Sequence, residues 1–75
     1  MRKIEKGKKY RHFKGNEYIV LGVAMHTETE ETLVVYKNTA DEDKVYARPY
    51  DMFAGEVDRD KYPEVKQKYR FEEIL

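Results

Sequence analysis

The chain of 75 residues contains no cysteine, no tryptophan and no serine. Without cysteine, neither a disulfide nor a thiolate-bound metal can stabilise the fold, and a cysteine nucleophile or a serine triad is excluded from its chemistry. The four glycines are too scattered to form a phosphate-binding loop or a dinucleotide-binding motif. No apolar run approaches the roughly 20 residues that span a bilayer as a helix. The fold therefore depends on a small apolar core.

Charge and aromatic rings are abundant. Charged and hydrophobic residues each make up 40% of the chain, and seven tyrosines and three phenylalanines supply the rings. The net charge is zero, yet residues 1–14 hold seven Lys or Arg and one Glu, a net of +6, whereas residues 15–44 hold two basic and seven acidic residues, a net of −5. The length predicts one domain over residues 1–75. Residues 1–8 are expected to be a basic tail, either open to phosphates or simply solvated.

Strand patterns dominate the first two thirds of the chain. The predicted strands are Lys9–Lys14, Glu17–His26, Thr32–Tyr36 and Lys44–Arg48, and alternation returns around Tyr69–Phe71. Gly15 and Asn16 form a polar turn pair between the first two strands. Gly22 interrupts the second strand and favours a bulge or sharp bend there. Pro49 ends the fourth strand.

Helical signals are short and come later. Asp51 is positioned to cap a turn that contains Met52 and Phe53, which we expect to plug one end of the core. Pro63 is suited to the first position of a second helical turn. Four or five short, bent strands with one or two helical turns predict a mainly β fold, either a small SH3-like barrel or an open β-roll.

Three strings carry a resemblance to a known family: Tyr10-Arg-His-Phe-Lys-Gly15, His26-Thr-Glu-Thr29 and Arg48-Pro-Tyr-Asp-Met-Phe53. In this order and spacing they resemble a family of short bacterial proteins catalogued only as a domain of unknown function. The sequence departs from that pattern at Tyr46, where a Trp is common, and at Tyr69, where a Pro is common. The resemblance implies no catalytic residue, so the side chains must be interpreted on their own chemistry.

The two histidines lie on neighbouring predicted strands. If Gly15 and Asn16 form a two-residue hairpin turn, His12 faces Ile19 across the strands. His26 then lies on the opposite face of the sheet, unless a bulge in the second strand reverses the alternation. The sequence therefore predicts that the histidines meet only if this bulge is present.

The leading hypothesis is a binding module for nucleic acid or a nucleotide-like ligand. Small barrels present aromatic rings and basic side chains on one face, where bases stack and phosphates pair with cations. The basic residues are expected to attract the ligand, Tyr46 to stack on it, and His26 with Glu28 to provide directional hydrogen bonds. The predicted ligand-binding residues are Arg11, His12, Lys14, His26, Glu28, Tyr46 and Arg48.

Two other classes of function remain open. His26, Glu28 and His12 carry the donor types of a metal-assisted or His/Glu hydrolytic enzyme, although the same residues are typical of an exposed strand end. The other class is a structural or protein-interaction role, in which the protein is a monomer or a weak homodimer formed through an open sheet edge. No cofactor, metal or membrane partner is expected. The basic start has no hydrophobic segment behind it, which predicts a cytoplasmic bacterial protein without a signal peptide.

Overall fold

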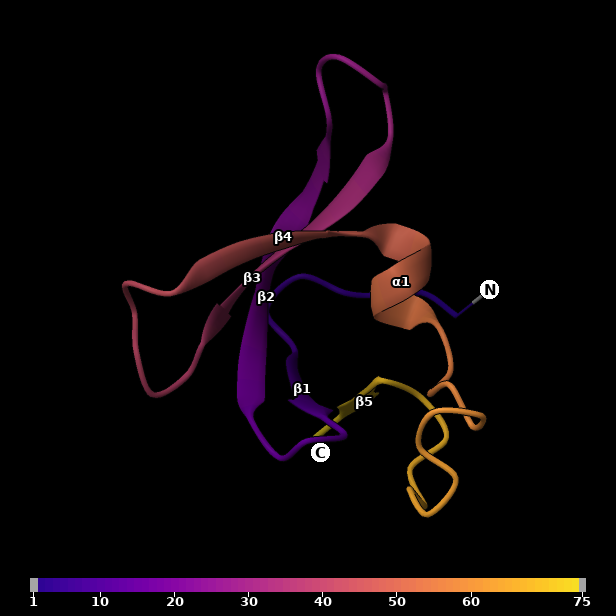
Figure 1. Ribbon diagram of the computed structural model, residues 1–75. Helices are drawn as coiled ribbons and strands as arrows, with labels where there is room; N and C mark the ends of the chain where they lie inside the picture. Colours follow the sequence, from indigo (N-terminus) through magenta and orange to yellow (C-terminus); the bar gives the residue numbers. More distant parts are fainter. Residues whose placement is uncertain (1, 75) are drawn as a thin grey trace.

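The computed structural model describes residues 2–74, which form an open antiparallel sheet with one short helix (Figure 1). The strands are joined in the order β4-β3-β2-β1-β5, and within residues 2–74 the outer strands β4 and β5 are not paired with each other. Of the two predicted architectures, the structure is the open β-roll. The elements are β1 (Lys9–His12), β2 (Glu17–Met25), β3 (Thr32–Asn38), β4 (Val45–Pro49), α1 (Tyr50–Ala54) and β5 (Phe71–Glu73).

Only one of the two predicted helical turns forms a helix. α1 follows directly on β4 and has Pro49 as its N-cap residue, with no side-chain capping hydrogen bond; Asp51 lies in its first turn. The segment around Pro63 forms turns instead, in which the N–H of Tyr62 donates to the C=O of Asp58 at 2.9 Å. No helix within residues 2–74 has the length and apolar character needed to cross a membrane.

The bulge predicted at Gly22 is present in β2. Val20 pairs with Tyr36 but Gly22 pairs with Val35, so one extra residue of β2 is accommodated between them. In a regular strand, residues two apart share a face, so Val20 would share its face with Gly22. The extra residue shifts this alternation by one, and Val20 instead shares its face with Val23.

The core is largely aromatic and lies between the sheet and α1. Phe53 and Phe71 stack at its centre, with ring centroids 4.1 Å apart and an interplanar angle of 7°. The predicted plug is half correct, because Phe53 is fully buried while Met52 is 50% exposed. The buried apolar side chains described are Ile4, Tyr10, Val20, Val34, Tyr36, Phe53, Ala54, Val57 and Phe71.

The N-terminal segment lies against the body of the protein rather than extending as the expected tail. Ile4 is buried, and its N–H donates to the Tyr50 hydroxyl at 2.7 Å. The Arg2 guanidinium donates to the carbonyl oxygens of Ala54 and Phe71 and lies 4.0 Å from the Tyr69 ring centroid. Residues 2–4 thus connect α1 to β5.

The β1–β2 hairpin has a different register from the predicted one. The prediction places His12 opposite Ile19, whereas in the structure Lys9 lies opposite Ile19 and Tyr10 opposite Tyr18. β1 is therefore shifted by three residues along β2. A shift by an odd number exchanges the two faces of β1. Tyr10 and His12 therefore lie on the face that carries Tyr18, and Arg11 lies on the other.

His12 closes this hairpin with both its backbone and its ring. Its N–H donates to the C=O of Asn16 and its C=O accepts from the N–H of Gly15, each at 2.8 Å, which leaves a three-residue loop. Its Nδ1 accepts a hydrogen bond from the N–H of Lys14 at 3.1 Å. Gly15 has φ +107°, a conformation that costs glycine little. This three-residue loop with glycine in its last position is a favoured hairpin connection.

Candidate functional site

A row of aromatic rings crosses the inner face of the sheet, from β4 to the loop that precedes β5. Each ring lies within 6.1 Å, centroid to centroid, of the next. Phe71, at the middle of the row, is buried, whereas Tyr46 at one end is 41% exposed. We call this row the aromatic face; in order, its members are Tyr46, Tyr18, Phe71, His12, Phe13 and Tyr62.

Arg48 lies over the centre of the aromatic face. Its guanidinium carbon is 5.3 Å from the Phe71 ring centroid, within range of a cation–π interaction. Its Nε donates to the hydroxyl of the buried Tyr36 at 3.2 Å. These contacts use the Nε–H and one face of the guanidinium, and Arg48 makes no salt bridge to a carboxylate within residues 2–74.

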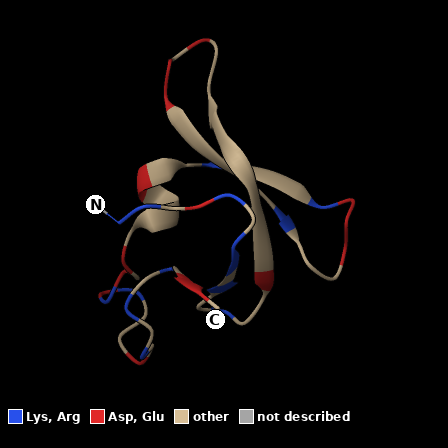
Figure 2. Ribbon diagram, turned by 180° about the vertical axis from the view of Figure 1, so that it is seen from behind, with Lys and Arg blue, Asp and Glu red and all other residues tan. Residues whose placement is uncertain are grey.

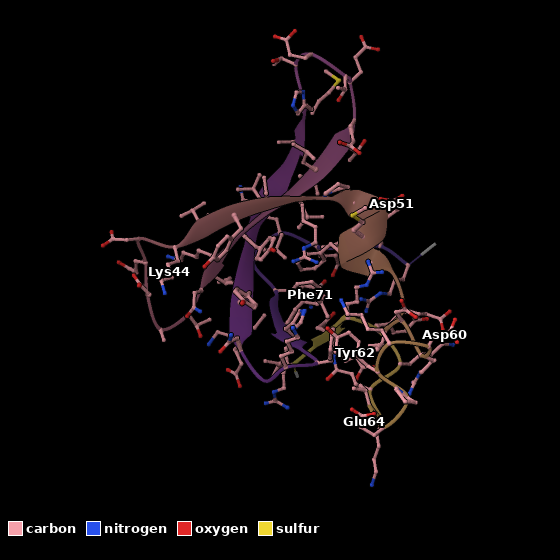
Figure 3. All side chains as sticks on the ribbon, viewed as in Figure 1. Lys44, Asp51, Asp60, Tyr62, Glu64 and Phe71 are labelled. Atoms are coloured by element: carbon pink, nitrogen blue, oxygen red, sulfur yellow. The ribbon has the colours of Figure 1, made fainter. Side chains whose placement is uncertain are left out.

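Two further cations border the same face. The Nζ of Lys14 lies 5.6 Å from the Tyr62 ring centroid and 6.0 Å from that of Phe13. Arg70 donates from Nη1 to the C=O of Met52 at 3.1 Å, which holds it beside α1. Neither cation has a salt bridge to a described carboxylate. In Figure 3, nitrogen atoms of several side chains gather around Phe71.

His12 is partly buried and is affected by all three cations. Its pKa is lowered from the ordinary value of 6.5, first because the ring is partly buried and then because Arg48, Lys14 and Arg70 oppose a further positive charge. Its Nδ1 already accepts the Lys14 N–H, so the neutral ring has its proton on Nε2. His12 is therefore a neutral, half-buried ring between three positive charges.

Arg11 lies away from the aromatic face. It pairs with Glu17 across the β1–β2 ladder, and its Nη2 is 3.0 Å from Glu17 Oε2. Since Arg11 and His12 are consecutive residues of one strand, their side chains leave opposite faces of the sheet.

His26 and Glu28 also lie far from the aromatic face, at the tip of the β2–β3 hairpin. His26 Nδ1 accepts from the N–H of Glu28 at 3.1 Å and of Thr29 at 3.3 Å, and Glu30 adopts a left-handed φ of 62°. From the β1 turn to His26, β2 runs about 30 Å. The bulge is present, but the two histidines remain apart because they lie at opposite ends of β2.

Four of the seven predicted residues therefore converge: His12, Lys14, Tyr46 and Arg48. Sequence reasoning misses Tyr62 and Arg70, which come from the irregular segment between α1 and β5. An isolated antiparallel bridge between Glu56 and Tyr69 joins the start of that segment to its end, and no local periodicity signals it. Within residues 2–74, no group of three His, Asp or Glu side chains has the geometry of a metal site.

Charge is segregated along the ribbon. Acidic residues mark the tip of the β2–β3 hairpin and the β3–β4 turn, whereas basic residues follow the N-terminal segment and β1 (Figure 2). No pocket is present on the part of the chain that the structure describes, so the aromatic face is not a cleft.

Comparison with known proteins places the chain in a family. Residues 8–73 match the family model described as "Protein of unknown function (DUF1653)". The crystal structure of a DUF1653 protein from Bordetella bronchiseptica is similar, with a TM-score of 0.76 and 28% sequence identity over 93% of this chain and 87% of that one. No curated protein matches the chain. The resemblance inferred from the three motifs is thus confirmed, and the chain belongs to the DUF1653 family.

Proposed function

We propose that the protein is a small binding module whose aromatic face binds single-stranded nucleic acid. The observation that carries this proposal is that Arg48 lies over Phe71 and Lys14 beside Phe13 and Tyr62, with Arg70 near His12, and that none of these cations pairs with a described carboxylate. All rings of the aromatic face except Phe71 are at least partly exposed. Like charges held together without counter-charges cost free energy. An anionic ligand offsets that cost.

The rings and cations supply the two components of single-strand recognition. Bases stack on aromatic side chains, each stack contributing about 1–3 kcal/mol, and cations along the same groove neutralise phosphates. Tyr46 offers the most exposed ring, at the β4 end of the row. Lys14 and Tyr62 form the other end, where the cation lies beside the ring. A single strand laid along the row would therefore meet at least partly exposed rings at its two ends and Arg48 near its middle.

The hydrolytic alternative has less support from the geometry. It relied on His26 and Glu28 acting together, with His12 close by. The ring of His26 is instead hydrogen bonded, through Nδ1, to the backbone N–H of Glu28, and the Glu28 side chain is solvent exposed. This arrangement is that of a side chain that caps a turn, so the motif is better explained by the shape of the hairpin tip.

Fluorescence anisotropy with labelled 12-nucleotide dT and U oligomers at 50 and 300 mM salt tests the proposal. We expect binding that weakens as salt rises, since each phosphate contact releases counterions. Lys14→Gln/Arg70→Gln should weaken binding about tenfold or more and reduce the salt dependence. Tyr46→Ala should weaken it by about tenfold, because one stacking platform is lost.

A matched control removes one Lys and one Arg elsewhere. Arg11 lies on the opposite face of the sheet, and Lys44 lies at the β3–β4 turn, far from Phe71 in Figure 3. Arg11→Gln/Lys44→Gln should therefore change the affinity less than about twofold. Equal losses in the two double variants would show non-specific attraction to charge, and no binding at 50 mM salt would contradict the proposal.

A further inference from the structure

The outer part of the β2–β3 hairpin, residues 21–33, extends beyond β1. We call this part the arm. The pairing of β1 with β2 ends at Lys9 and Ile19, and the N-terminal segment then occupies the edge at Val20, which exchanges hydrogen bonds with Gly7 and Lys8. Beyond Val20 the edge of β2 has no neighbouring strand within residues 2–74. Figure 1 shows the arm standing clear of β1, α1 and β5.

The bulge determines which backbone groups this edge presents. The N–H of His26 points toward the β3 side of the hairpin, where it donates to the C=O of Glu31 at 2.8 Å. Backbone groups alternate along an antiparallel strand, so those of Ala24 also point to β3, and those of Val23 and Met25 point away from it. Within residues 2–74, no hydrogen bond is made to these outward groups. Two donors and two acceptors are therefore open on one edge.

The arm also lacks the features that protect an edge from pairing. The stretch from Leu21 to Met25 contains no charge and no proline, and its Val23 and Met25 side chains are 50% and 63% exposed. The other free edges are different. β5 is three residues long and contains Glu72 and Glu73, and β4 ends in a proline. Proteins normally shield edges with charges, prolines or short strands, so an apolar open edge is a docking surface.

We propose that the arm binds a second copy of this chain by antiparallel pairing of the two β2 edges about a two-fold axis at Ala24. In that register Val23 faces Met25 of the second copy, and Met25 faces its Val23. Each pair exchanges two backbone hydrogen bonds, so every outward group of both residues finds a partner. The Val23 and Met25 side chains of both copies then share one face and cover each other, while the two small Ala24 side chains meet at the axis.

Charge complementarity favours a second copy over an unrelated partner. Residues 26–31 contain three Glu and no Lys or Arg, a net of −3, whereas residues 2–9 contain five Lys or Arg and one Glu, a net of +4. In this arrangement the hairpin tip that follows Met25 lies toward the part of the second copy's β2 that precedes Val23, where Val20 is bonded to Gly7 and Lys8. The acidic tip of each arm thus meets the basic N-terminal segment of the other chain. The interface is self-complementary, as a two-fold dimer requires.

Amide hydrogen exchange followed by NMR reads this interface residue by residue. The amides of Ala24 and His26, which point to β3, should be protected at every protein concentration. The amides of Val23 and Met25 should exchange freely at about 20 μM and become protected at about 1 mM, as the edges pair. Sedimentation equilibrium over the same range should show the mass rising toward twice that of the chain, and high salt should oppose this rise.

Two variants separate this edge from other contacts. Val23→Lys places charges at the centre of the proposed interface on a side chain that is exposed in the single chain, so dimerisation should weaken by about tenfold or more while the fold is retained. Val45→Lys is the matched control on β4, where Val45 is 52% exposed, and it should leave dimerisation unchanged. The proposal is overturned if the mass stays that of one chain at 1 mM, if the Val23 and Met25 amides never become protected, or if Val45→Lys disrupts the dimer and Val23→Lys does not.

Discussion

β2 and β3 pass through two regions of very different character. Near β1 they are covered by α1, β5 and the N-terminal segment, and their side chains, Val20 and Tyr36 among them, are buried. In the arm the same strands lie in solvent and end in an acidic tip. One continuous hairpin thus contributes to an aromatic core at one end and to an open, apolar edge at the other. Because the local strand propensity is similar throughout, the difference shows that coverage by other segments, rather than strand formation, determines where stability lies.

The strongest test of this contrast is to truncate one large apolar side chain in each region. Phe71→Ala should lower the free energy of unfolding by about 3–5 kcal/mol, because it removes the ring that stacks on Phe53 and leaves a cavity. Met25→Ala, at the exposed edge of the arm, should change it by less than about 0.5 kcal/mol. Urea denaturation followed by circular dichroism at a protein concentration of about 10 μM measures both. Similar losses for the two variants would mean that the arm is part of the core.

Removing one guanidinium from each face of the sheet should give a smaller contrast. Arg48→Ala should cost about 2 kcal/mol, since it leaves the buried Tyr36 hydroxyl without its partner and removes a cation–π contact with Phe71. Arg11→Ala should cost less than about 0.5 kcal/mol, because the ion pair with Glu17 is exposed. Thermal unfolding of both variants in the same buffer gives the comparison. If Arg11→Ala is the more damaging change, Arg48 is not a structural residue of the core.

The glycines distinguish the two regions in a further way. Gly15 has φ +107°, so Gly15→Ala should cost about 1 kcal/mol in strain although no atom obstructs the new methyl group. Gly22, at the bulge in β2, has an ordinary φ and open space around it. Gly22→Ala should therefore be neutral or stabilise the protein by up to about 1 kcal/mol, through the lower entropy of the unfolded chain. Chemical denaturation resolves these values, and a destabilising Gly22→Ala would show that the bulge needs glycine.

The smallest expected effect is a dependence of stability on pH that arises from His12. Its pKa is lower in the folded protein than the 6.5 of the unfolded chain, because of partial burial first and of Arg48, Lys14 and Arg70 second. As pH falls below 6.5 the unfolded state takes up the proton first, so the free energy of unfolding decreases until the lowered pKa is reached; above 6.5 this contribution is complete. Unfolding curves between pH 5.5 and 7.5 should show this slope, and His12→Gln should reduce it. An unchanged slope in His12→Gln would assign it to other groups.

The sequence predicts the strands and the bulge well. Their signals are local: alternation of apolar residues, Gly22 inside an apolar run, and Pro49 after a strand. Of the seven predicted ligand-binding residues, the structure brings His12, Lys14, Tyr46 and Arg48 to the aromatic face; that this face binds a ligand stays a prediction. These residues converge because β1 and β4 flank the central pair of strands and curve over the same core.

The register of β1 and the roles of the histidines are not predicted, for a physical reason. A two-residue turn at Gly15 satisfies local propensity as well as the observed loop does. The observed three-residue loop is favoured because it buries Tyr10 and lets the His12 ring accept a backbone N–H. His26 caps its own hairpin tip in the same manner. Such side-chain caps leave no trace in hydrophobic periodicity, so the sequence does not reveal that both histidine rings accept backbone N–H groups in turns.

The way the chain is closed sets the order in which it can fold. β5 pairs with β1, and Arg2 bonds to the carbonyl of Phe71, 69 residues further along the chain. Contacts of this sequence separation form slowly, because a long loop must close before they contribute. A nascent chain that has exposed β1 to α1 still lacks Phe71, so Tyr18, Tyr36 and Phe53 can pack on one another but not on the ring at the centre of the core. The aromatic core is therefore completed only when residue 73 has left the ribosome, and until then the newly made strands expose their rings to chaperones and to one another.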